Sequence, residues 1–353
     1  MFGAGLKYLL QETWLARGPL AWSLTPIAVL YLGLVKLRQA AYRLNIFKTE
    51  VFPVPVIVVG NVVVGGAGKT PLVIALVSHF KHRGLRAGVV SRGYGRQCEK
   101  TIEIKTGMSS TLTGDEPALI QAKTGVPVVV AKNRSEAVRL LLLSHPLIDV
   151  VVCDDGLQHY GLYRDIEIAV FDDRGIGNGW VLPAGMLREP WPQRRTQGVD
   201  LILHTGAAPQ FPGYTSQRYF GPYANSADGR QVPLSSLRHK RVIAFAAIAN
   251  PQAFFEMLRK SGVVLAETIT LPDHYSFTTG LLGIGVNPGN IDAVLCTEKD
   301  AIKLFSDLSA APKNLLSVPL MFTAEPDFYA ALDKLLAPLI CPKHSQVPFG
   351  DGH

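Results

Sequence analysis

The clearest indication of chemistry in this sequence is a glycine-rich turn followed by a lysine and a threonine. Residues 65–70 read Gly-Gly-Ala-Gly-Lys-Thr, between an apolar run at 54–59 and an amphipathic stretch at 72–80. Glycines let backbone N–H groups surround phosphate oxygens, and the N-terminus of a following helix adds positive potential. The pattern predicts the phosphate-binding loop of a nucleoside triphosphatase or kinase. The residues expected to bind the nucleotide are Gly65, Gly66, Ala67, Gly68, Lys69 and Thr70.

Lys69 and Thr70 have separate predicted roles in this loop. Lys69 would contact the β- and γ-phosphates, and the Thr70 hydroxyl would ligate Mg²⁺. One position departs from the usual pattern, because Val63 stands where a first glycine is common. We expect Gly65 and Gly66 to supply the turn instead. A glycine turn between packed elements, with no phosphate, is the alternative interpretation.

Two adjacent aspartates follow another apolar run. Asp154 and Asp155 come after residues 149–153, which read Asp-Val-Val-Val-Cys. In proteins with a phosphate-binding loop, a carboxylate at the end of a neighbouring strand holds Mg²⁺ directly or through water. The sequence therefore predicts Asp154 as a metal ligand. A pair of acids in a solvated turn is the alternative.

Other polar clusters leave their roles open. Arg92 and Arg96 lie between glycines at 91–96, where they could hold a phosphate or simply occupy a surface turn. Asp115 stands where a helix is expected to begin. It could cap that helix, or it could accept the proton of a substrate hydroxyl during phosphoryl transfer. Further clusters lie at 182–190, 271–275 and 297–300, the last with Thr297 as a possible helix cap.

These clusters follow short runs that are typical of strands. Apolar runs at 54–59, 87–91, 126–131, 150–153, 166–171 and 201–204 alternate with helical stretches near 71–82 and 134–143. Unbroken apolar strands are buried on both faces. We therefore predict an α/β fold of the P-loop NTPase type, with a mostly parallel sheet covered by helices. Ligands of such sheets bind beyond the carboxyl ends of the strands, so the polar clusters should share one edge.

Composition changes suggest how the chain is divided. We expect a kinase domain at 46–215, a linker or hinge at 216–240 that is rich in Pro, Gly and Ser, and a smaller α/β domain at 241–340. Within the smaller domain, strands are expected at 241–246, 263–267, 293–296 and 315–322, with helices near 251–261 and from about 299. Residues 341–353 are expected to form a disordered tail. The 353 residues, 48% of them apolar, suffice for two cores.

Net charge and cysteine content indicate the kind of partner and the redox environment of the protein. The net charge of +7 favours acidic partners, and the four cysteines have no paired spacing that would indicate zinc or disulfides. A reduced, cytosolic setting fits this cysteine usage.

Residues 1–45 form a separate N-terminal segment of membrane-like composition. Residues 1–50 hold six basic and two acidic residues, and residues 18–35 are uncharged and accompanied by tryptophan and tyrosine. Pro19 and Pro26 interrupt this run, which is only just long enough to span a bilayer. We favour a helix lying at the membrane interface over a transmembrane helix. A helix packed on the body of the protein is a third interpretation.

Taken in order, the motifs resemble those of the tetraacyldisaccharide 4′-kinase family, the lipid A 4′-kinases. The matching segments are 60–71, 91–96, 114–117, 154–159, 182–190, 272–275 and 297–300. The resemblance implies transfer of the γ-phosphate of ATP to the 4′-hydroxyl of a tetraacyldisaccharide 1-phosphate, which gives lipid IVA. It also implies a location at the cytoplasmic face of the bacterial inner membrane.

The resemblance assigns further site residues. It implies that Asp115 is the general base, and that His274 reaches over from the second domain to pair with it. Glu189 would help Asp154 to organise Mg²⁺, and Arg92 and Tyr94 would lie near the phosphates or the substrate.

Other protein classes fit less well. A membrane-cycling P-loop ATPase switch would carry a lysine directly before the two glycines, where this chain has Val64. A GTPase-type metallochaperone would read guanine with Asn-Lys-x-Asp, but Glu298 replaces the asparagine. A nucleic-acid partner is not expected, because much of the positive charge lies in the membrane-like segment.

Overall fold

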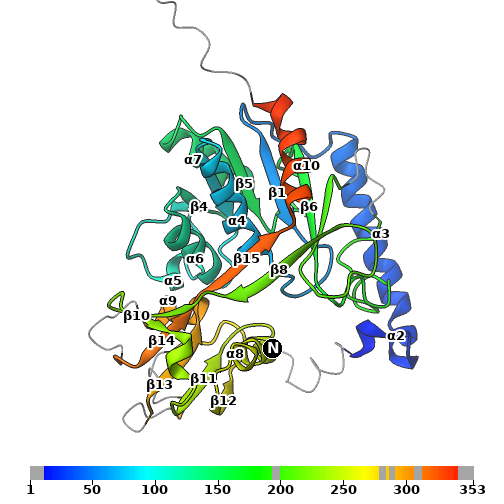
Figure 1. Cartoon of the computed structure of the whole chain (residues 1–353). Coiled ribbons are helices and arrows are strands. Elements are labelled where there is room, and N and C mark those ends of the chain that lie inside the picture. Colours follow the sequence, from blue (N-terminus) through cyan, green and yellow to red (C-terminus); the bar gives the residue numbers. More distant parts are fainter. Residues whose placement is uncertain (1–11, 193–198, 278–283, 286–290, 306–311, 341–353) are drawn as a thin grey trace, which may run out of the picture.

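The computed structural model describes residues 12–192, 199–277, 284–285, 291–305 and 312–340. The predicted tail at 341–353 and the first eleven residues of the N-terminal segment therefore lie outside the described residues. Two β-sheets organise the described chain (Figure 1).

The larger sheet has nine strands in the order β15-β8-β7-β6-β1-β5-β2-β4-β3. The pairs from β8 to β4 are parallel, and the two edge pairs, β15 with β8 and β4 with β3, are antiparallel. The strands are β1 (Val56–Gly60), β2 (Ala87–Ser91), β3 (Ile102–Glu103), β4 (Val128–Val130), β5 (Val150–Asp154), β6 (Ile166–Phe171), β7 (Leu201–His204), β8 (Tyr214–Phe220) and β15 (Leu320–Ala324). The predicted α/β fold with a mostly parallel sheet is confirmed.

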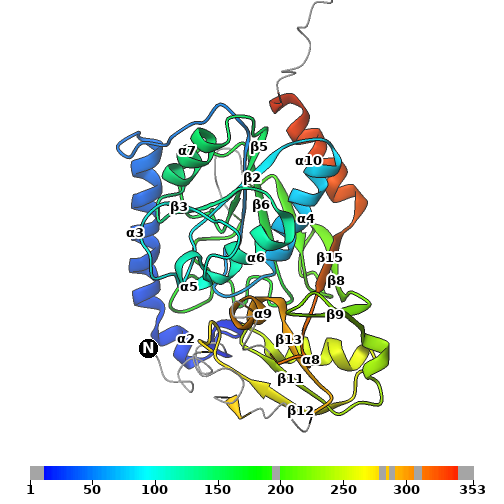
Figure 2. The ribbon, with the colours of Figure 1, turned by 90° about the vertical axis from the view of Figure 1, so that its left-hand side faces the viewer.

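Helices cover both faces of this sheet (Figures 1 and 2). On one face, α4 (Lys69–His82), α6 (Asp115–Thr124) and α10 (Pro326–Leu336) share a core with alternate strand residues. On the other face, α7 (Arg134–Ser144) packs together with the loops that follow β5 and β6. The short helix α5 (Ser110–Thr113) precedes α6. This double cover explains why β1, β2 and β5 are buried at every position and read as continuous apolar runs.

The second sheet has six strands in the order β10-β9-β14-β13-β11-β12. Its strands are β9 (Tyr223–Ser226), β10 (Gln231–Pro233), β11 (Val242–Ala246), β12 (Leu265–Thr270), β13 (Ala293–Thr297) and β14 (Leu315–Val318). Two helices, α8 (Pro251–Lys260) and α9 (Glu298–Leu304), and the 3₁₀ turns η1 (Leu234–Leu237) and η4 (Ala337–Leu339) complete the described elements after β7.

The chain passes between the two sheets at places that differ from the predicted boundaries. Residues 216–240, expected to be a linker or hinge, hold most of β8 together with β9 and β10. The run at 315–322 is two strands, and β15 returns to the larger sheet to pair with β8. Composition concealed β8 because Ser216 is its only fully buried residue and the others are polar or partly exposed. Residues 320–340 thus pack with the larger sheet.

The N-terminal segment forms α2 (Pro19–Ser23) and α3 (Thr25–Arg43), and α3 lies along one side of the molecule (Figure 2). Ala28 of α3 is buried, and the Tyr31 hydroxyl donates to the Arg188 carbonyl at 2.7 Å. The opposite side of α3 leaves a stripe of large apolar residues exposed. Within the described residues, no helix combines the length and the apolar character that crossing a bilayer requires.

Candidate active site

The glycine-rich loop connects the end of β1 to the start of α4. Gly68 is the N-cap of α4 and has a left-handed backbone with φ of 78°. A Cβ atom at Gly68 would lie 3.3 Å from the side chain of Thr205, whose hydroxyl donates to the Ala67 carbonyl at 2.9 Å. The strand, loop and helix predicted for residues 54–80 are therefore present, with the N–H groups at the start of α4 facing the loop.

Lys69 lies between two oxygen acceptors. Its Nζ atom donates to Asn61 Oδ1 and lies 3.2 Å from Asp155 Oδ1. The Asn61 amide also donates to the Gly65 carbonyl at 2.9 Å. Asn61 therefore fixes both the loop and its lysine, a role that its position before the glycines did not reveal.

Arg174, which the sequence did not indicate, holds the loop from outside. Its guanidinium donates to the carbonyls of Val64 and Gly66 at 3.3 and 3.2 Å, and pairs with Asp172 at 2.7 Å. Two loop carbonyls are thereby satisfied, which leaves the N–H groups of the turn to face a ligand.

Asp154 is buried at the end of β5 and has an unsatisfied oxygen. Ser91 donates to its Oδ2 atom at 3.2 Å, whereas Oδ1 has no hydrogen-bond partner within the described part of the chain. Burial, together with the charges of Glu116 and Asp155, raises the pKa of Asp154 to about 7. A buried carboxylate oxygen without a donor suits a cation, so the residues present fit Mg²⁺.

Asp155 has a different environment from its neighbour. Its backbone is left-handed, with φ of 50°, and its Oδ1 atom lies 3.2 Å from Lys69 and 3.5 Å from Arg188. Burial alone raises the pKa of Asp155, but the charges of Lys69 and Arg188 outweigh it and lower that pKa overall. Asp155 is thus the ionised partner of the loop lysine.

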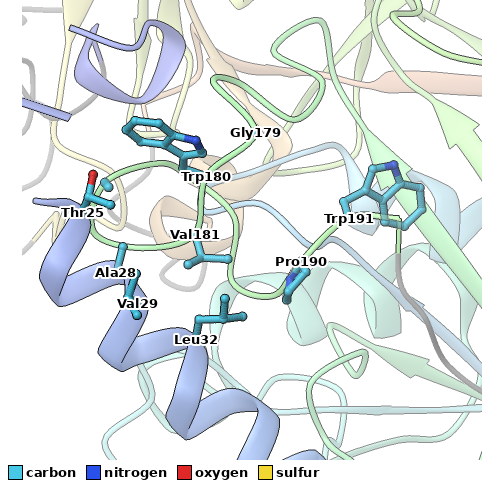
Figure 3. Close-up of a pocket in the computed structure, with 10 residues that line it drawn as sticks. Thr25, Ala28, Val29, Leu32, Gly179, Trp180, Val181, Pro190 and Trp191 are labelled. Atoms are coloured by element: carbon cyan, nitrogen blue, oxygen red, sulfur yellow. The ribbon is translucent and has the colours of Figure 1, made fainter. Parts of the chain in front are cut away.

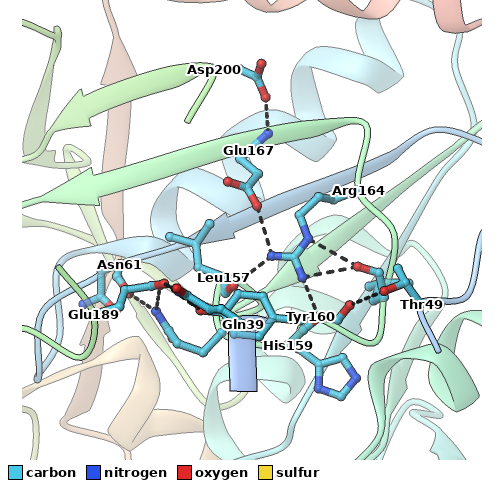
Figure 4. Close-up of polar contacts among 12 residues, drawn as sticks. Gln39, Thr49, Asn61, Leu157, His159, Tyr160, Arg164, Glu167, Glu189 and Asp200 are labelled. Carbon is cyan, nitrogen blue, oxygen red and sulfur yellow. Dashed lines mark hydrogen bonds and ion pairs between the residues drawn. The ribbon is translucent and has the colours of Figure 1, made fainter. Parts of the chain in front are cut away.

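Glu189 is buried in a polar network that includes the N-terminal helix (Figure 4). Its Oε1 atom accepts from Gln158 at 2.9 Å, and its Oε2 atom accepts from Tyr160 at 2.7 Å and from Gln39 of α3 at 3.2 Å. Gln158 also donates to the Asn61 carbonyl at 3.1 Å. Unlike Asp154, Glu189 has a donor on each oxygen, and the network joins α3 to the phosphate loop.

The turn after Asp155 is held by Arg164 and surrounded by positive charge (Figure 4). Arg164 pairs with Glu167 at 3.0 Å and donates to the carbonyls of Leu157 and His159. Burial and nearby arginines lower the pKa of His159 to about 4. The arginines that contribute are Arg134, Arg164, Arg38 and Arg92. The exposed Arg92 therefore belongs to a cationic region beside this turn.

Asp115 and His274, far apart in sequence, meet in the structure. Gly114 is the N-cap of α6 and Asp115 makes no capping hydrogen bond, so the capping role considered for Asp115 is not observed. Its Oδ2 atom lies 2.9 Å from His274 Nδ1 and 2.8 Å from Lys303 Nζ. Burial raises the pKa of Asp115, but the hydrogen bonds from His274 and Lys303 outweigh it, so the pKa is lowered overall. The exposed Tyr94 ring lies 5.3 Å from the His274 ring.

A cavity of about 240 Å³ is lined by other residues (Figure 3). It lies between α3 and the loop that carries Trp180 and Trp191, and most of its lining is apolar. No predicted site residue lines it. The cavity therefore does not correspond to the nucleotide site.

Comparison with known proteins gives consistent matches over nearly the whole chain. The family model described as Tetraacyldisaccharide-1-P 4′-kinase matches residues 20–337. The tetraacyldisaccharide 4′-kinase of Polaromonas naphthalenivorans is 56% identical over 348 residues, which cover 99% of each chain. That of Acidovorax ebreus is 46% identical over 95% of this chain and 96% of its own. The crystal structure of LpxK from Aquifex aeolicus in complex with ATP is 29% identical, with a TM-score of 0.76, and covers 91% of this chain and 100% of its own.

Proposed function

The chain belongs to the tetraacyldisaccharide-1-P 4′-kinase family, and from this premise we propose how its residues carry out the reaction. The enzyme transfers the γ-phosphoryl group of ATP to the 4′-hydroxyl of a tetraacyldisaccharide 1-phosphate, giving lipid IVA in lipid A biosynthesis. The relative from Aquifex aeolicus was crystallised with ATP. We assign ATP in this chain to the loop at 65–70, with Lys69 on the β- and γ-phosphates.

Mg²⁺ fits beside this loop. The Thr70 hydroxyl and the unsatisfied Oδ1 atom of Asp154 would hold the ion, and it would offset negative charge on the transferring phosphoryl group. Glu189 would influence the Mg²⁺ site indirectly, through a chain of hydrogen bonds and an ion pair. Its partner Gln158 accepts a hydrogen bond from Arg188 at 3.3 Å, and Arg188 pairs with Asp155 beside Asp154.

Asp115 is our candidate for the general base. Both donors seen on its carboxylate, His274 and Lys303, bind Oδ2, so Oδ1 is the oxygen that can receive a proton. As the 4′-oxygen bonds to the γ-phosphorus, its proton passes to Asp115 and the bond to the β-phosphate oxygen breaks, releasing ADP. His274 holds the carboxylate in place, and Tyr94 covers the imidazole on the side of the 91–96 loop.

The observation that best supports these assignments is the hydrogen bond between His274 and Asp115. It lies at the same edge of the larger sheet as Lys69 and Asp154. Glu116, the neighbour of Asp115, is close enough to contribute to the raised pKa of Asp154. Base, phosphate loop and metal ligand therefore share one electrostatic neighbourhood, as in-line phosphoryl transfer requires.

The substrate and the exposed face of α3 support association with the cytoplasmic face of the inner membrane. The acyl chains of the substrate lie in a bilayer, whereas its sugar and ATP lie in water. We propose that the exposed apolar stripe of α3 enters the interface and that the enzyme binds peripherally or monotopically. Arg92 and Arg38, in the cationic region beside His159, would attract the phosphorylated head of the lipid.

A labelled-transfer assay tests the proposal. Purified protein, Mg²⁺ and γ-labelled ATP are combined with the tetraacyldisaccharide 1-phosphate in detergent. We expect label in the lipid for the wild type and a loss of about a hundredfold or more for Asp115→Ala, because a general base contributes about 10²- to 10⁴-fold. ATP binding should change little in this variant. Asp327→Ala, an exposed aspartate in the first turn of α10, is the matched control and should retain full activity.

Two outcomes would contradict parts of this proposal. Transfer at the wild-type rate by Asp115→Ala would remove its role as base. Release of label only as inorganic phosphate by the wild type, stimulated by lipid vesicles, would favour the alternative of a membrane-cycling P-loop ATPase switch.

A further inference from the structure

The segment 297–300, Thr-Glu-Lys-Asp, has no part in the reaction described above, yet it sets the position of α9. Thr297 is the N-cap of α9 and accepts from the Asp300 backbone at 3.2 Å. The buried Asp300 carboxylate accepts from Thr297 at 2.7 Å and from the Ala247 backbone at 3.1 Å. The first turn of α9 is thus fixed to the end of β11.

This fixed helix aims two lysines at the start of α6. Lys299 and Lys303 are four residues apart, so they lie on the same side of α9. Lys303 contacts Asp115 at 2.8 Å, and Lys299 contacts the next residue, Glu116, at 3.4 Å. Both lysines are largely buried, and the two pairs span the boundary between the two sheets.

The same lysines also hold the residues on either side of His274. Lys303 donates to the Tyr275 carbonyl at 3.0 Å, and Lys299 lies 3.5 Å from Asp273. Between them, His274 has a left-handed backbone with φ of 62°, a conformation that is uncommon for residues other than glycine.

We propose that Lys303, supported by Lys299, is a positioning residue that clamps the His274 loop onto Asp115 when the second sheet docks on the first. This inference rests on the proposed role of Asp115 as general base. Lys303 and His274 occupy the same oxygen of Asp115, so together they direct the other oxygen toward the acceptor hydroxyl. The charge of Lys303 also keeps the carboxylate ionised and ready to take a proton.

The charged surroundings of Asp115 give this clamp a specific pH signature. The titratable and charged groups that face Asp115 are Lys299 and Lys303 of α9, Asp273 and His274 of the loop, and Glu116 of α6. Burial raises the pKa of Asp115, and Lys303 is one of the groups that lower it. Removing Lys303 should therefore raise the pKa of Asp115. A base must be ionised to act, so the acid limb of the rate profile should move to higher pH.

Lys303→Met tests the clamp in the labelled-transfer assay. We expect kcat to fall about tenfold to a hundredfold, as misplacement of a catalytic group does, with the KM for ATP changed less than about twofold. The acid limb of the pH profile of kcat should move to higher pH by about one unit, the pKa shift that one close opposite charge produces. Lys303→Arg, which keeps the charge, should restore most of the rate.

Lys123→Met is the matched control. Lys123 pairs with Glu298 at 2.7 Å across the same α6–α9 contact but does not touch Asp115 or the His274 loop. This variant should keep both kcat and the pH profile of the wild type. A melting temperature measured for each variant separates loss of folding from loss of positioning.

Several results would overturn the clamp. Lys303→Met with a wild-type kcat and an unmoved acid limb would do so, as would equal losses in Lys303→Met and Lys123→Met. If Lys303→Met does not fold, two other variants test the clamp. An unchanged acid limb in Lys299→Met would count against it, and so would an inactive Lys303→Arg with a native melting temperature. These results remain distinct from failure of the base itself, which Asp115→Ala reports.

Discussion

The apolar stripe on α3 predicts how strongly the enzyme binds a membrane. Ile27, Leu30, Leu34 and Leu37 follow each other at spacings of three and four residues, so they lie on one side of the helix. Their exposed fractions are 56, 67, 60 and 68%. Fully burying a leucine side chain contributes about 1.5–3 kcal/mol, so inserting two-thirds of one contributes roughly 1–2 kcal/mol. Replacing Leu30 and Leu37 together should therefore cost about 2–4 kcal/mol of membrane binding.

This cost converts into a measurable change in partition. At about 1.4 kcal/mol for each factor of ten, Leu30→Gln combined with Leu37→Gln should bind vesicles roughly thirty- to several-hundredfold more weakly. Co-sedimentation with vesicles of zwitterionic and anionic phospholipids measures the partition coefficient. Glutamine keeps the helix propensity, and both sites are exposed, so the melting temperature should hardly change.

A surface leucine elsewhere provides the control. Leu143 of α7 is 75% exposed but lies outside the stripe, and Leu143→Gln should bind vesicles like the wild type. If the double variant and Leu143→Gln bind equally well, the α3 stripe is not the membrane-binding surface. Vesicle binding that depends only on lipid charge would lead to the same conclusion and would point to the arginines instead.

Two more predictions concern the loop and the turn after Asp155. Lys69→Met should lower kcat/KM about a hundredfold or more and weaken ATP binding, whereas the exposed Lys81→Met on the same helix should not; normal turnover by Lys69→Met would remove the phosphate-loop assignment. For His159, the pKa is lowered from 6.5 to about 4, so below pH 6.5 the unfolded chain binds a proton that the folded chain does not, and stability falls as the pH falls toward 4. Urea unfolding measures the free energy of unfolding that is lost between pH 7 and pH 5. His159→Gln should reduce this loss by about 1 kcal/mol, a figure discounted for the partial exposure of His159. Identical losses in the variant and the wild type would contradict this prediction.

The parts of the fold that sequence predicted well are those whose signals are local. The strand, loop and helix around Lys69 lie within a few dozen residues, and the strands at 87–91, 166–171 and 201–204 have the predicted bounds. Strands buried on both faces show themselves as apolar runs wherever they pair. Strand β8 and its partner β15, about a hundred residues later, lack such a run because most of their residues are polar or partly exposed. β8 was therefore missed, and β15 was predicted only as part of the run at 315–322.

Site residues followed the same rule. Lys69, Thr70 and Asp154 were predicted from a loop and from the end of a strand, both of which are local patterns. Asp115 and His274 were assigned roles only through the family resemblance, because 159 residues separate them. Arg174 reaches a carbonyl 110 residues away, and neither its loop nor its spacing carries a motif.

The N-terminal helix and the phosphate loop are parts of one hydrogen-bonded structure. Gln39 of α3 donates to Glu189, Glu189 accepts from Gln158, and Gln158 donates to the Asn61 carbonyl beside the loop. Glu189 is buried, so displacing α3 would remove one of the two donors that its Oε2 atom has, Gln39, and leave Tyr160. A helix that were only a flexible anchor would need no such link. If α3 binds the membrane as we propose, the link would fix the depth and direction at which the catalytic edge meets the interface. This would matter because the 4′-hydroxyl of a bilayer-bound lipid could not diffuse to a misplaced base.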